Sequence, residues 1–425
     1  MAKTKECLTV TGAAKGNDIL PTAESIYREV LRAKRGGFSA TEYERARDEF
    51  MSRVEKVYNN RNSQETGSYV QQYVRHFIDN EPIPSIDWYY TQMQTLSKMV
   101  SVNEINQLIQ EVVTDNNRVL LAMMPEKDDF KFPTESEMAA VMKAVDAEEI
   151  EAFVDNVKEE PLIPSLPAAG KIVKTGRNAM WDAEEWTLSN GVKVLVKTTK
   201  FKDDEIVMSA IANEGLSRVL KNIDIASYQA MSLVTGSYGI NSYTNSDLQK
   251  YLQGKQAGVS LSFGSYQRSV SGSTTPKDLP VMMELLYGVF TGFNVSADEF
   301  KALQDLYVGL LQNQEANPQF VFSRDVAKAI YKSPYRQVMS VDDVKNASRE
   351  VILNTVRGQL ANAADYTFVF VGNVDPEALK PLVEQYIATL PAKASKATKR
   401  VAKTDPALCI TPGNGRDEFT TKMEN

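Results

Sequence analysis

Hydrophobic and polar residues alternate with a period of two along four short segments in the middle of the chain: 186–197, 206–211, 259–263 and 266–271. Such alternation is typical of β-strands that bury one face. In the first segment Asn190-Gly191 separates two alternating runs. This predicts a hairpin whose two-residue turn needs positive φ at both central residues. The four segments together predict an antiparallel-rich sheet.

The period changes to that of a helix between and after these strands. Residues 223–234 carry apolar side chains at the spacing that buries one stripe of a helix. Thr275-Pro276 is an N-cap and first-turn pair, and it predicts the start of a second apolar helix that ends near Phe290. Strands covered by helices make this region an α+β domain.

One more strand and one more helix follow before residue 391. Residues 367–371 predict a buried strand, and Asp375-Pro376 supplies the N-cap and first position of the next helix. Pro381 lies deep inside that helix, where a proline removes a backbone hydrogen bond. We therefore expect a kink at Pro381.

Helical patterns dominate the first 155 residues. Capping boxes at Ser39–Glu42 and Ser101–Glu104 predict two helix starts. Only two strands are predicted here, at 8–10 and 118–124, and two strands alone are marginal as a sheet. We therefore expect this part to be incomplete, with its earlier strands encoded upstream.

A proline-rich segment separates the two regions. Residues 159–170 contain three prolines, which hold the backbone extended and leave few amides for a sheet. The predicted domains are the later, mainly helical part of one domain at 1–155, a Pro-rich linker at 156–180, a complete domain at 181–395, and a linker into a truncated further domain at 396–425, where a strand-like run begins at Glu418.

The two regions share an order of elements. Gly37-Phe-Ser39 and Gly292-Phe293, the latter followed by Ser296, each lead into a capping box and a long helix with an aromatic residue at its start. Further helices and then a buried strand follow in both. We interpret this agreement as a tandem repeat of one domain type. Chance similarity is the alternative, because capping boxes are common.

Composition limits the possible functions. The chain has 425 residues and a net charge of -7, which argues against a nucleic-acid-binding surface of any size. No apolar run approaches the ~18 residues of a membrane span, and no export signal is visible, so the compartment stays open. Cys7 and Cys409 lie at opposite ends of the chain and outside any metal-binding cluster.

Three motifs in this order resemble a known family. They are Leu188-Ser-Asn-Gly-Val-Lys-Val194, Phe370-Val-Gly-Asn-Val-Asp-Pro376 with its Leu390-Pro391 exit, and the helix start from Gly37 to Arg45. The chain resembles zinc metallopeptidases of the insulinase/pitrilysin type, which are built from tandem α+β domains that form the two halves of a clam-shell. Residues 1–155 resemble the later part of the second domain, and 181–395 resemble the third, non-catalytic domain.

The resemblance implies zinc in the full-length protein but no zinc site here. The family holds zinc with His-x-x-Glu-His on one helix of its first domain, where both imidazoles face the metal and the Glu serves as general base. In this chain the corresponding helix offers Ser227, Ala230 and Met231, and none of these is a useful zinc ligand.

The remaining candidates favour structural roles. His76, the one histidine, lies on a helical face beside Tyr73 and Phe77 and is expected to be packed or hydrogen-bonded. The acidic group at 203–205 is typical of a solvated loop, and Gly236-Ser-Tyr-Gly239 lacks the Lys-Ser/Thr of a phosphate loop. We therefore assign no catalytic, cofactor-binding or metal-binding residue.

These observations predict a non-catalytic segment of a zinc-dependent peptidase, which forms part of the chamber wall for peptide substrates and the hinge between halves. The partner would be the missing catalytic half, or a chain that carries it. Alone, the chain should be inactive. The alternative is an inert scaffold or partner-binding protein that retains the peptidase fold. A flanking His-x-x-Glu-His in the same reading frame would favour the peptidase.

Overall fold

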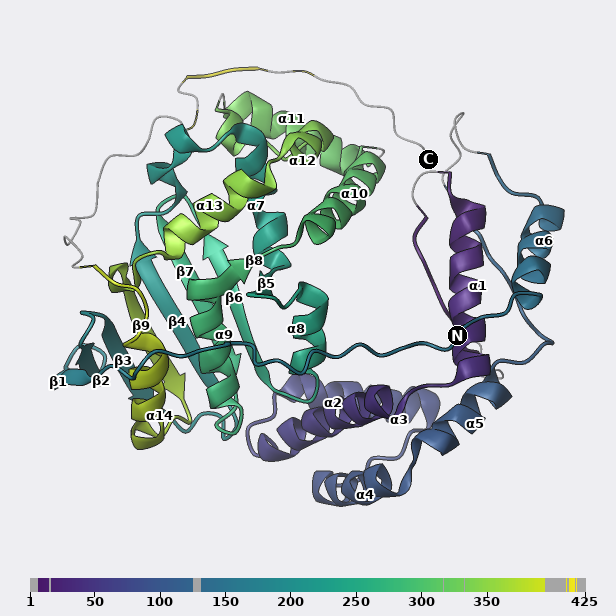
Figure 1. The fold of residues 1–425 in the computed structure, drawn as a ribbon, viewed down its shortest axis with the longest axis horizontal. Helices are drawn as coiled ribbons and strands as arrows, with labels where there is room; N and C mark the ends of the chain where they lie inside the picture. The colour runs from purple at the N-terminus through teal and green to yellow at the C-terminus, as the bar shows by residue number, and fades with distance from the viewer. Residues whose placement is uncertain are drawn as a thin grey trace. The chain divides into compact units, whose positions relative to one another are not determined.

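The computed structural model describes residues 7–14, 17–124, 131–315, 317–331, 333–393, 410, 413–416 and 418 (Figure 1). The predicted run from Glu418 and the position of Cys409 therefore lie almost entirely outside the described residues. Contacts divide the chain into two compact units, Met1–Val157 and Lys158–Asn425.

The first unit is helical in its described part. Its helices are α1 (Ile19–Gly36), α2 (Ala40–Asn59), α3 (Thr66–Asp79), α4 (Ile86–Met99), α5 (Val102–Val112) and α6 (Glu135–Asp146). The capping boxes predicted at Ser39 and Ser101 are confirmed at the starts of α2 and α5, and α6 begins with a third box at Thr134. These caps form because serine or threonine and the carboxylate three residues later satisfy each other's neighbouring amides.

The two strands predicted in this unit are wrong. Within the described residues, neither 8–10 nor 118–124 forms a strand. Most of their large apolar side chains are exposed, and Val119 is 90% exposed. A strand needs a neighbouring strand to accept and donate its backbone hydrogen bonds. No such neighbour exists among the residues described in this unit, so the two alternating segments form no inter-strand hydrogen bonds there.

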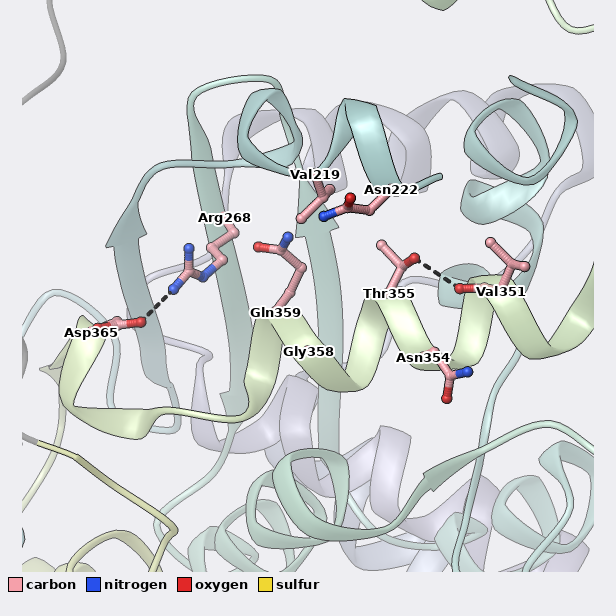
Figure 2. A pocket seen from close by; sticks show the side chains of 9 residues that line it. All are labelled: Val219, Asn222, Arg268, Val351, Asn354, Thr355, Gly358, Gln359 and Asp365. Atoms are coloured by element: carbon pink, nitrogen blue, oxygen red, sulfur yellow. Dashed lines mark hydrogen bonds and ion pairs between the residues drawn. The ribbon is translucent and has the colours of Figure 1, made fainter. Parts of the chain in front are cut away.

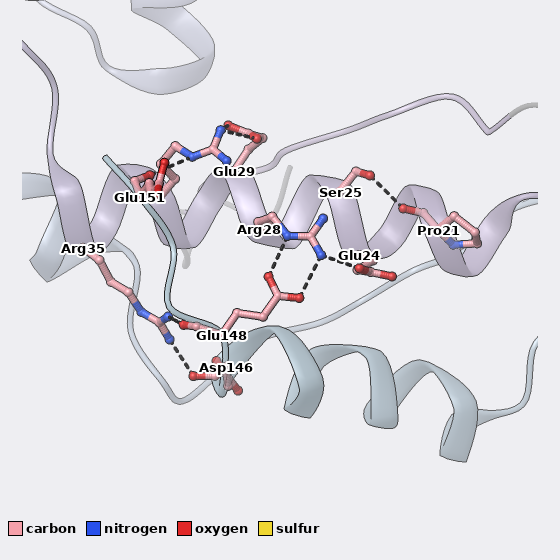
Figure 3. A network of polar contacts seen from close by, with 10 residues as sticks. Pro21, Glu24, Ser25, Arg28, Glu29, Arg35, Asp146, Glu148 and Glu151 are labelled. Atoms are coloured by element: carbon pink, nitrogen blue, oxygen red, sulfur yellow. Dashed lines mark hydrogen bonds and ion pairs between the residues drawn. The ribbon is translucent and has the colours of Figure 1, made fainter. Parts of the chain in front are cut away.

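The core of the first unit is small and lies between α1 and α6. Tyr27, Leu31 and Val145 form it, with Met142 and Ile150 packed against them. Polar contacts then extend the α1–α6 interface, as Figure 3 shows. Arg28 donates to both carboxylate oxygens of Glu148, at 2.6 and 2.8 Å, and Arg35 donates to the main-chain oxygens of Asp146 and Glu148. Helices α3, α4 and α5 bury no residue fully.

The second unit is built on a seven-stranded mixed sheet of order β1-β2-β3-β9-β4-β7-β6. The strands are β1 (Ile172–Asn178), β2 (Ala183–Leu188), β3 (Lys193–Thr198), β4 (Ile206–Asn213), β6 (Ala257–Phe263), β7 (Gln267–Thr274) and β9 (Tyr366–Gly372). All neighbours are antiparallel except β3 and β9, which run parallel. The predicted antiparallel-rich α+β architecture is confirmed.

Helices cover this sheet, as Figure 1 shows for α9 (Leu279–Gly292). Helix α9 and helix α7 (Ile225–Gly236) both pack on the β6 side of the sheet. The remaining helices are α8 (Asn245–Leu252), α10 (Ala297–Gln314), α11 (Pro318–Ile330), α12 (Val341–Asn346), α13 (Arg349–Leu360) and α14 (Pro376–Leu382). A short pair, β5 (Gly239–Ile240) and β8 (Phe293–Asn294), lies apart from the main sheet.

Alternation along the central strands produces the core. Trp186, Val194, Met208, Phe368 and Phe370 are fully or almost fully buried, each at an inward position of its strand. Burial of one large apolar side chain stabilises the fold by roughly 1.5–3 kcal/mol relative to an exposed one. This single continuous core positions the elements that form the candidate site.

The turn between β2 and β3 differs from the expected one. Leu188 N–H donates to the Val192 carbonyl, which leaves a three-residue loop at 189–191. Gly191 has φ of 84°, whereas Asn190 does not have positive φ. The prediction of positive φ at both turn centres is therefore wrong. A three-residue loop needs the left-handed conformation only at its last residue, which glycine adopts without strain.

The hydrogen-bond pattern of the helix changes next to Pro381, while the kink expected there stays a prediction. Helix α14 ends at Leu382, and Val383–Ile387 continues as a π-helix. The Asp375 cap and Pro376 at the first turn are as predicted. Proline supplies no N–H, so the hydrogen-bond pattern of the helix changes next to it. The Asn190 side chain then donates to the carbonyls of Ile387 and Leu390, at 2.9 and 3.1 Å.

The proline-rich segment is not a free linker where it is described. Leu162 and Ile163 are buried in the core of the second unit. The Asn241 amide donates to the Leu162 carbonyl at 2.9 Å, and the Tyr243 hydroxyl donates to the Glu160 carbonyl at 2.5 Å. β1 also begins inside the range assigned to the linker. The proposed boundary between domains therefore moves toward residue 157.

Candidate functional site

Helix α7 is the helix that, by the resemblance drawn from the sequence, corresponds to the zinc helix of the family. At the three positions in question, Ser227, Ala230 and Met231 are 0%, 1% and 4% exposed. Helices α12 and α13 cover this part of α7. The Ser227 hydroxyl accepts a hydrogen bond from Ser348 N–H at 2.9 Å, so its one polar group is already used. These positions serve packing.

The described residues do not fit a zinc ion. Within them, no group of three His, Cys, Asp or Glu side chains comes together in a way that could hold a metal. His76 lies on α3, exposed, and its Nδ1 is 2.6 Å from the Glu81 carbonyl oxygen. A protein zinc site needs three or four converging ligands. No chemical step through a metal is therefore assigned to these residues.

A polar cavity of about 600 Å³ lies elsewhere in the second unit, beside α13 (Figure 2). Four parts of the unit meet there: α13, the start of β7, the 3-10 helix η4 (Ala363–Asp365), and the segment at the 3-10 helix η2 (Leu220–Asn222). The lining residues are Val219, Asn222, Arg268, Val351, Asn354, Thr355, Gly358, Gln359 and Asp365. This volume is within the range of small-ligand pockets.

Arg268 forms one wall of the cavity and is only 4% exposed. It lies at an inward position of β7, and its guanidinium contacts three segments. It donates to an Asp365 carboxylate oxygen at 2.8 Å, to the Glu214 carbonyl at 2.6 Å, and to the Tyr366 hydroxyl at 3.2 Å. A buried charge is stable only when it is paired and hydrogen-bonded, and Arg268 meets both conditions.

Tyr366 links this ion pair to α13. Its hydroxyl donates to the Gln359 carbonyl at 3.0 Å and accepts from Arg268. Burial raises the pKa of Tyr366 to about 12, although the neighbouring Arg268 opposes the shift. The hydroxyl therefore stays protonated at neutral pH and acts as a fixed hydrogen-bond donor.

The chemistry available here is hydrogen bonding. The nine lining residues include one hydroxyl, that of Thr355, which donates to the Val351 carbonyl at 2.8 Å. None of the nine is a histidine, cysteine or lysine, and the one carboxylate among them, that of Asp365, is paired with Arg268. The cavity is suited to binding a polar ligand.

The sequence analysis missed this site. One signal was available in the sequence. Arg268 lies two residues before Val270 and therefore faces the same, inward side of the strand, where a charged side chain needs an oppositely charged partner. Its partner Asp365 is 97 residues away in the sequence, and nothing local connects the two.

The comparisons with known proteins agree with the fold. No family model matches the chain. A curated protein named "Zinc protease PQQL-like" from Arabidopsis thaliana is 25% identical over 370 residues, which are 85% of this chain and 36% of the relative. The "Probable zinc protease PqqL" of Escherichia coli strain K12 is 21% identical over 205 residues, 48% of this chain and 22% of the relative.

Among solved structures, a mutant of the ferredoxin protease FusC in complex with Arabidopsis ferredoxin has a TM-score of 0.52. It is 17% identical, and the match covers 91% of this chain and 43% of that one. This likeness concerns the fold. The chain is a relative of the insulinase/pitrilysin-type zinc peptidases.

This chain spans about a third of the length of the plant zinc protease and about a fifth of the bacterial one. Both curated relatives are named zinc proteases, whereas no group of three metal-ligating side chains is present in the described residues. Among those residues no helix is both apolar and long enough for a membrane span.

Proposed function

We propose that this chain is a non-catalytic segment of an insulinase/pitrilysin-type zinc peptidase. In this role it forms part of the wall of the chamber that holds peptide substrates, and it contributes to the hinge between the two halves. The observation that carries the proposal is the burial of Ser227, Ala230 and Met231 on α7. They stand at the positions where the resembled family has the His, Glu and His of its zinc motif, and here they are buried in the second unit.

Two features of the similar structure support this proposal: the part of it that the match covers, and the protein that is bound to it. The match covers most of this chain but less than half of the longer structure. The ferredoxin protease was solved in complex with a protein, ferredoxin. For the present chain we propose peptides or extended protein segments as the substrate of the full-length enzyme, with the catalytic half as the partner.

A second role is an inert scaffold that keeps the fold and binds a partner protein. The absence of a metal-ligand group among the described residues favours it as much as it favours the first role. The two roles differ in what lies beside this segment in the complete protein, because only the peptidase needs a His-x-x-Glu-His helix.

The reading frame that encodes this chain distinguishes the two roles. We expect sequencing of its transcript to reveal a His-x-x-Glu-His motif in frame. We also expect the complete product to cleave a quenched-fluorescence peptide in a zinc-dependent manner. Substitution of the motif's Glu by Gln should abolish cleavage. A complete product without the motif, or one that binds a partner but cleaves nothing, would establish the scaffold role.

A further inference from the structure

We propose that the cavity beside α13 binds an uncharged amide group, supplied by a peptide backbone or by an asparagine or glutamine side chain. Nothing in the comparisons concerns this cavity. The proposal deepens the proposed function and rests on it for the choice of a peptide as ligand. Three features carry it: an amide that lines the cavity without a hydrogen-bond partner, a glycine that leaves the cavity open, and the balance of charge around it.

The amide is that of Gln359. This side chain is only 6% exposed, and Figure 2 shows its amide directed between Arg268 and Asn222. The Gln359 main-chain carbonyl accepts from Tyr366, but the side-chain amide makes no hydrogen bond with any described residue. The Gln359 amide atoms are not among the described side-chain atoms that are both sealed from solvent and unpartnered, so they open to the cavity, and a ligand that displaces water from them must return a donor and an acceptor. A ligand in the cavity would provide the missing donor and acceptor.

The glycine is Gly358, in the last turn of α13. A Cβ at this position would meet no atom within 4 Å, so packing among the described residues does not require glycine. Glycine is also unfavourable inside a helix. Its presence keeps one wall of the cavity at the level of the backbone, which lets a ligand approach the helix closely.

Charge selects the class of ligand. Of the described residues that line the cavity, only Arg268 and Asp365 carry a charge, and they pair with each other at 2.8 Å. The wall is therefore neutral, and phosphate or another anion would find no unpaired cation among them. Gln359 and Asn222 each offer a donor and an acceptor. An amide is the neutral group that returns one donor and one acceptor in the same plane.

The test uses the 425-residue chain and a blocked diglutamine peptide, acetyl-Gln-Gln-amide. Binding is measured by isothermal titration calorimetry and by saturation-transfer NMR. The matched probes are acetyl-Glu-Glu-amide and inorganic phosphate. We expect the diglutamine peptide to bind with a dissociation constant at least fivefold lower than that of the diglutamate peptide, and phosphate not to bind.

Two variants at one position locate the site. Gly358→Leu extends a side chain into the cavity and should weaken diglutamine binding at least tenfold, whereas Gly358→Ala should change it less than about threefold. Gln359→Leu removes only the amide and should also weaken binding at least tenfold. Thermal unfolding shows whether each variant is folded. If Gly358→Leu does not fold, the binding measured for Gln359→Leu tests the location of the site.

The proposal is overturned if the wild-type chain does not bind the diglutamine peptide, if Gly358→Leu or Gln359→Leu binds it as well as the wild type, or if phosphate or the diglutamate peptide binds more tightly. Because the test measures binding by this chain alone, it is separate from the proposed function. A missing His-x-x-Glu-His motif would end the peptidase assignment and leave this binding result intact.

Discussion

Arg268 shows how a single residue departs from the pattern around it. It lies on the inward side of β7, between residues that build the core, yet it carries a full charge. Asp365, the Glu214 carbonyl and the Tyr366 hydroxyl compensate for its burial together. The cluster fastens β7 to the end of β4 and to the start of β9. Tyr366 is the member of this cluster whose raised pKa makes the cluster's contribution to stability depend on pH.

The stability of the second unit should fall at high pH through Tyr366. Burial raises the pKa of Tyr366 to about 12, above the value of about 10 expected in the unfolded chain. A raised pKa means that the folded state favours the protonated hydroxyl. The contribution to stability is therefore complete below about pH 10 and is lost as the pH rises from about 10 to about 12.

Urea unfolding of wild type and Tyr366→Phe, followed by far-ultraviolet circular dichroism at about pH 8 and about pH 11, measures this effect. We expect Tyr366→Phe to be less stable at the lower pH, because its two hydrogen bonds are lost. The difference between the proteins should narrow at the higher pH. Equal losses in both proteins would show that other groups carry the pH dependence.

At the scale of elements, the β2–β3 hairpin and the end of α14 depend on each other. Asn190, in the hairpin loop, donates two hydrogen bonds to the carbonyls of Ile387 and Leu390. Ile387 is the last residue of the π-helix, and its carbonyl also accepts from Leu390 N–H. The contact spans about two hundred residues of sequence and fastens the last helix to the first strands of the sheet.

Asn190→Ala should destabilise the second unit by about 1–2 kcal/mol, since two hydrogen bonds to carbonyls are removed. The matched control is Asn354→Ala, in which an exposed amide on α13 is removed. The control should change the free energy of unfolding by less than about 0.5 kcal/mol. Urea unfolding compares the three proteins. Equal stability of Asn190→Ala and the control would mean that the loop does not hold α14.

Elements that depend on neighbouring residues were predictable from the sequence. The central strands, the capping boxes at Ser39, Ser101 and Ser296, and the irregularity after Pro381 follow from local chemistry. Elements that depend on distant partners were not. The strand predicted at 118–124 lacks a partner, and the conformation of Asn190 accompanies its bonds to Ile387 and Leu390. The cavity requires residues from 219 to 365, so no local pattern indicates it.

At the scale of the whole molecule, the segment that connects the two units is shorter than the proline-rich segment at 159–170. On one side Asp155 accepts from Arg45 at 2.5 Å and from Thr41 at 2.6 Å, both in the first unit. On the other side Lys158 donates to the Ser242 carbonyl, and Leu162 enters the core of the second unit. The residues between these contacts form the proposed boundary.

Limited proteolysis should therefore cut first between residues 155 and 158. The expected product is a stable fragment that begins near Lys158 and retains Leu162 and Ile163, whose burial stabilises the second unit. Mass spectrometry of the early fragments identifies the cut. A stable fragment that begins near Lys171 would instead restore the longer Pro-rich linker as the boundary.

Zinc content is the most direct test of the claim that this segment is not catalytic by itself. The purified 425-residue chain is incubated with one equivalent of zinc, dialysed and analysed by inductively coupled plasma mass spectrometry, and its cleavage of a quenched-fluorescence peptide is followed in parallel. A zinc site takes three or four converging ligands, which the described residues do not provide. We predict no stoichiometric zinc and no cleavage. One tightly bound zinc per chain, together with zinc-dependent cleavage, would contradict the account.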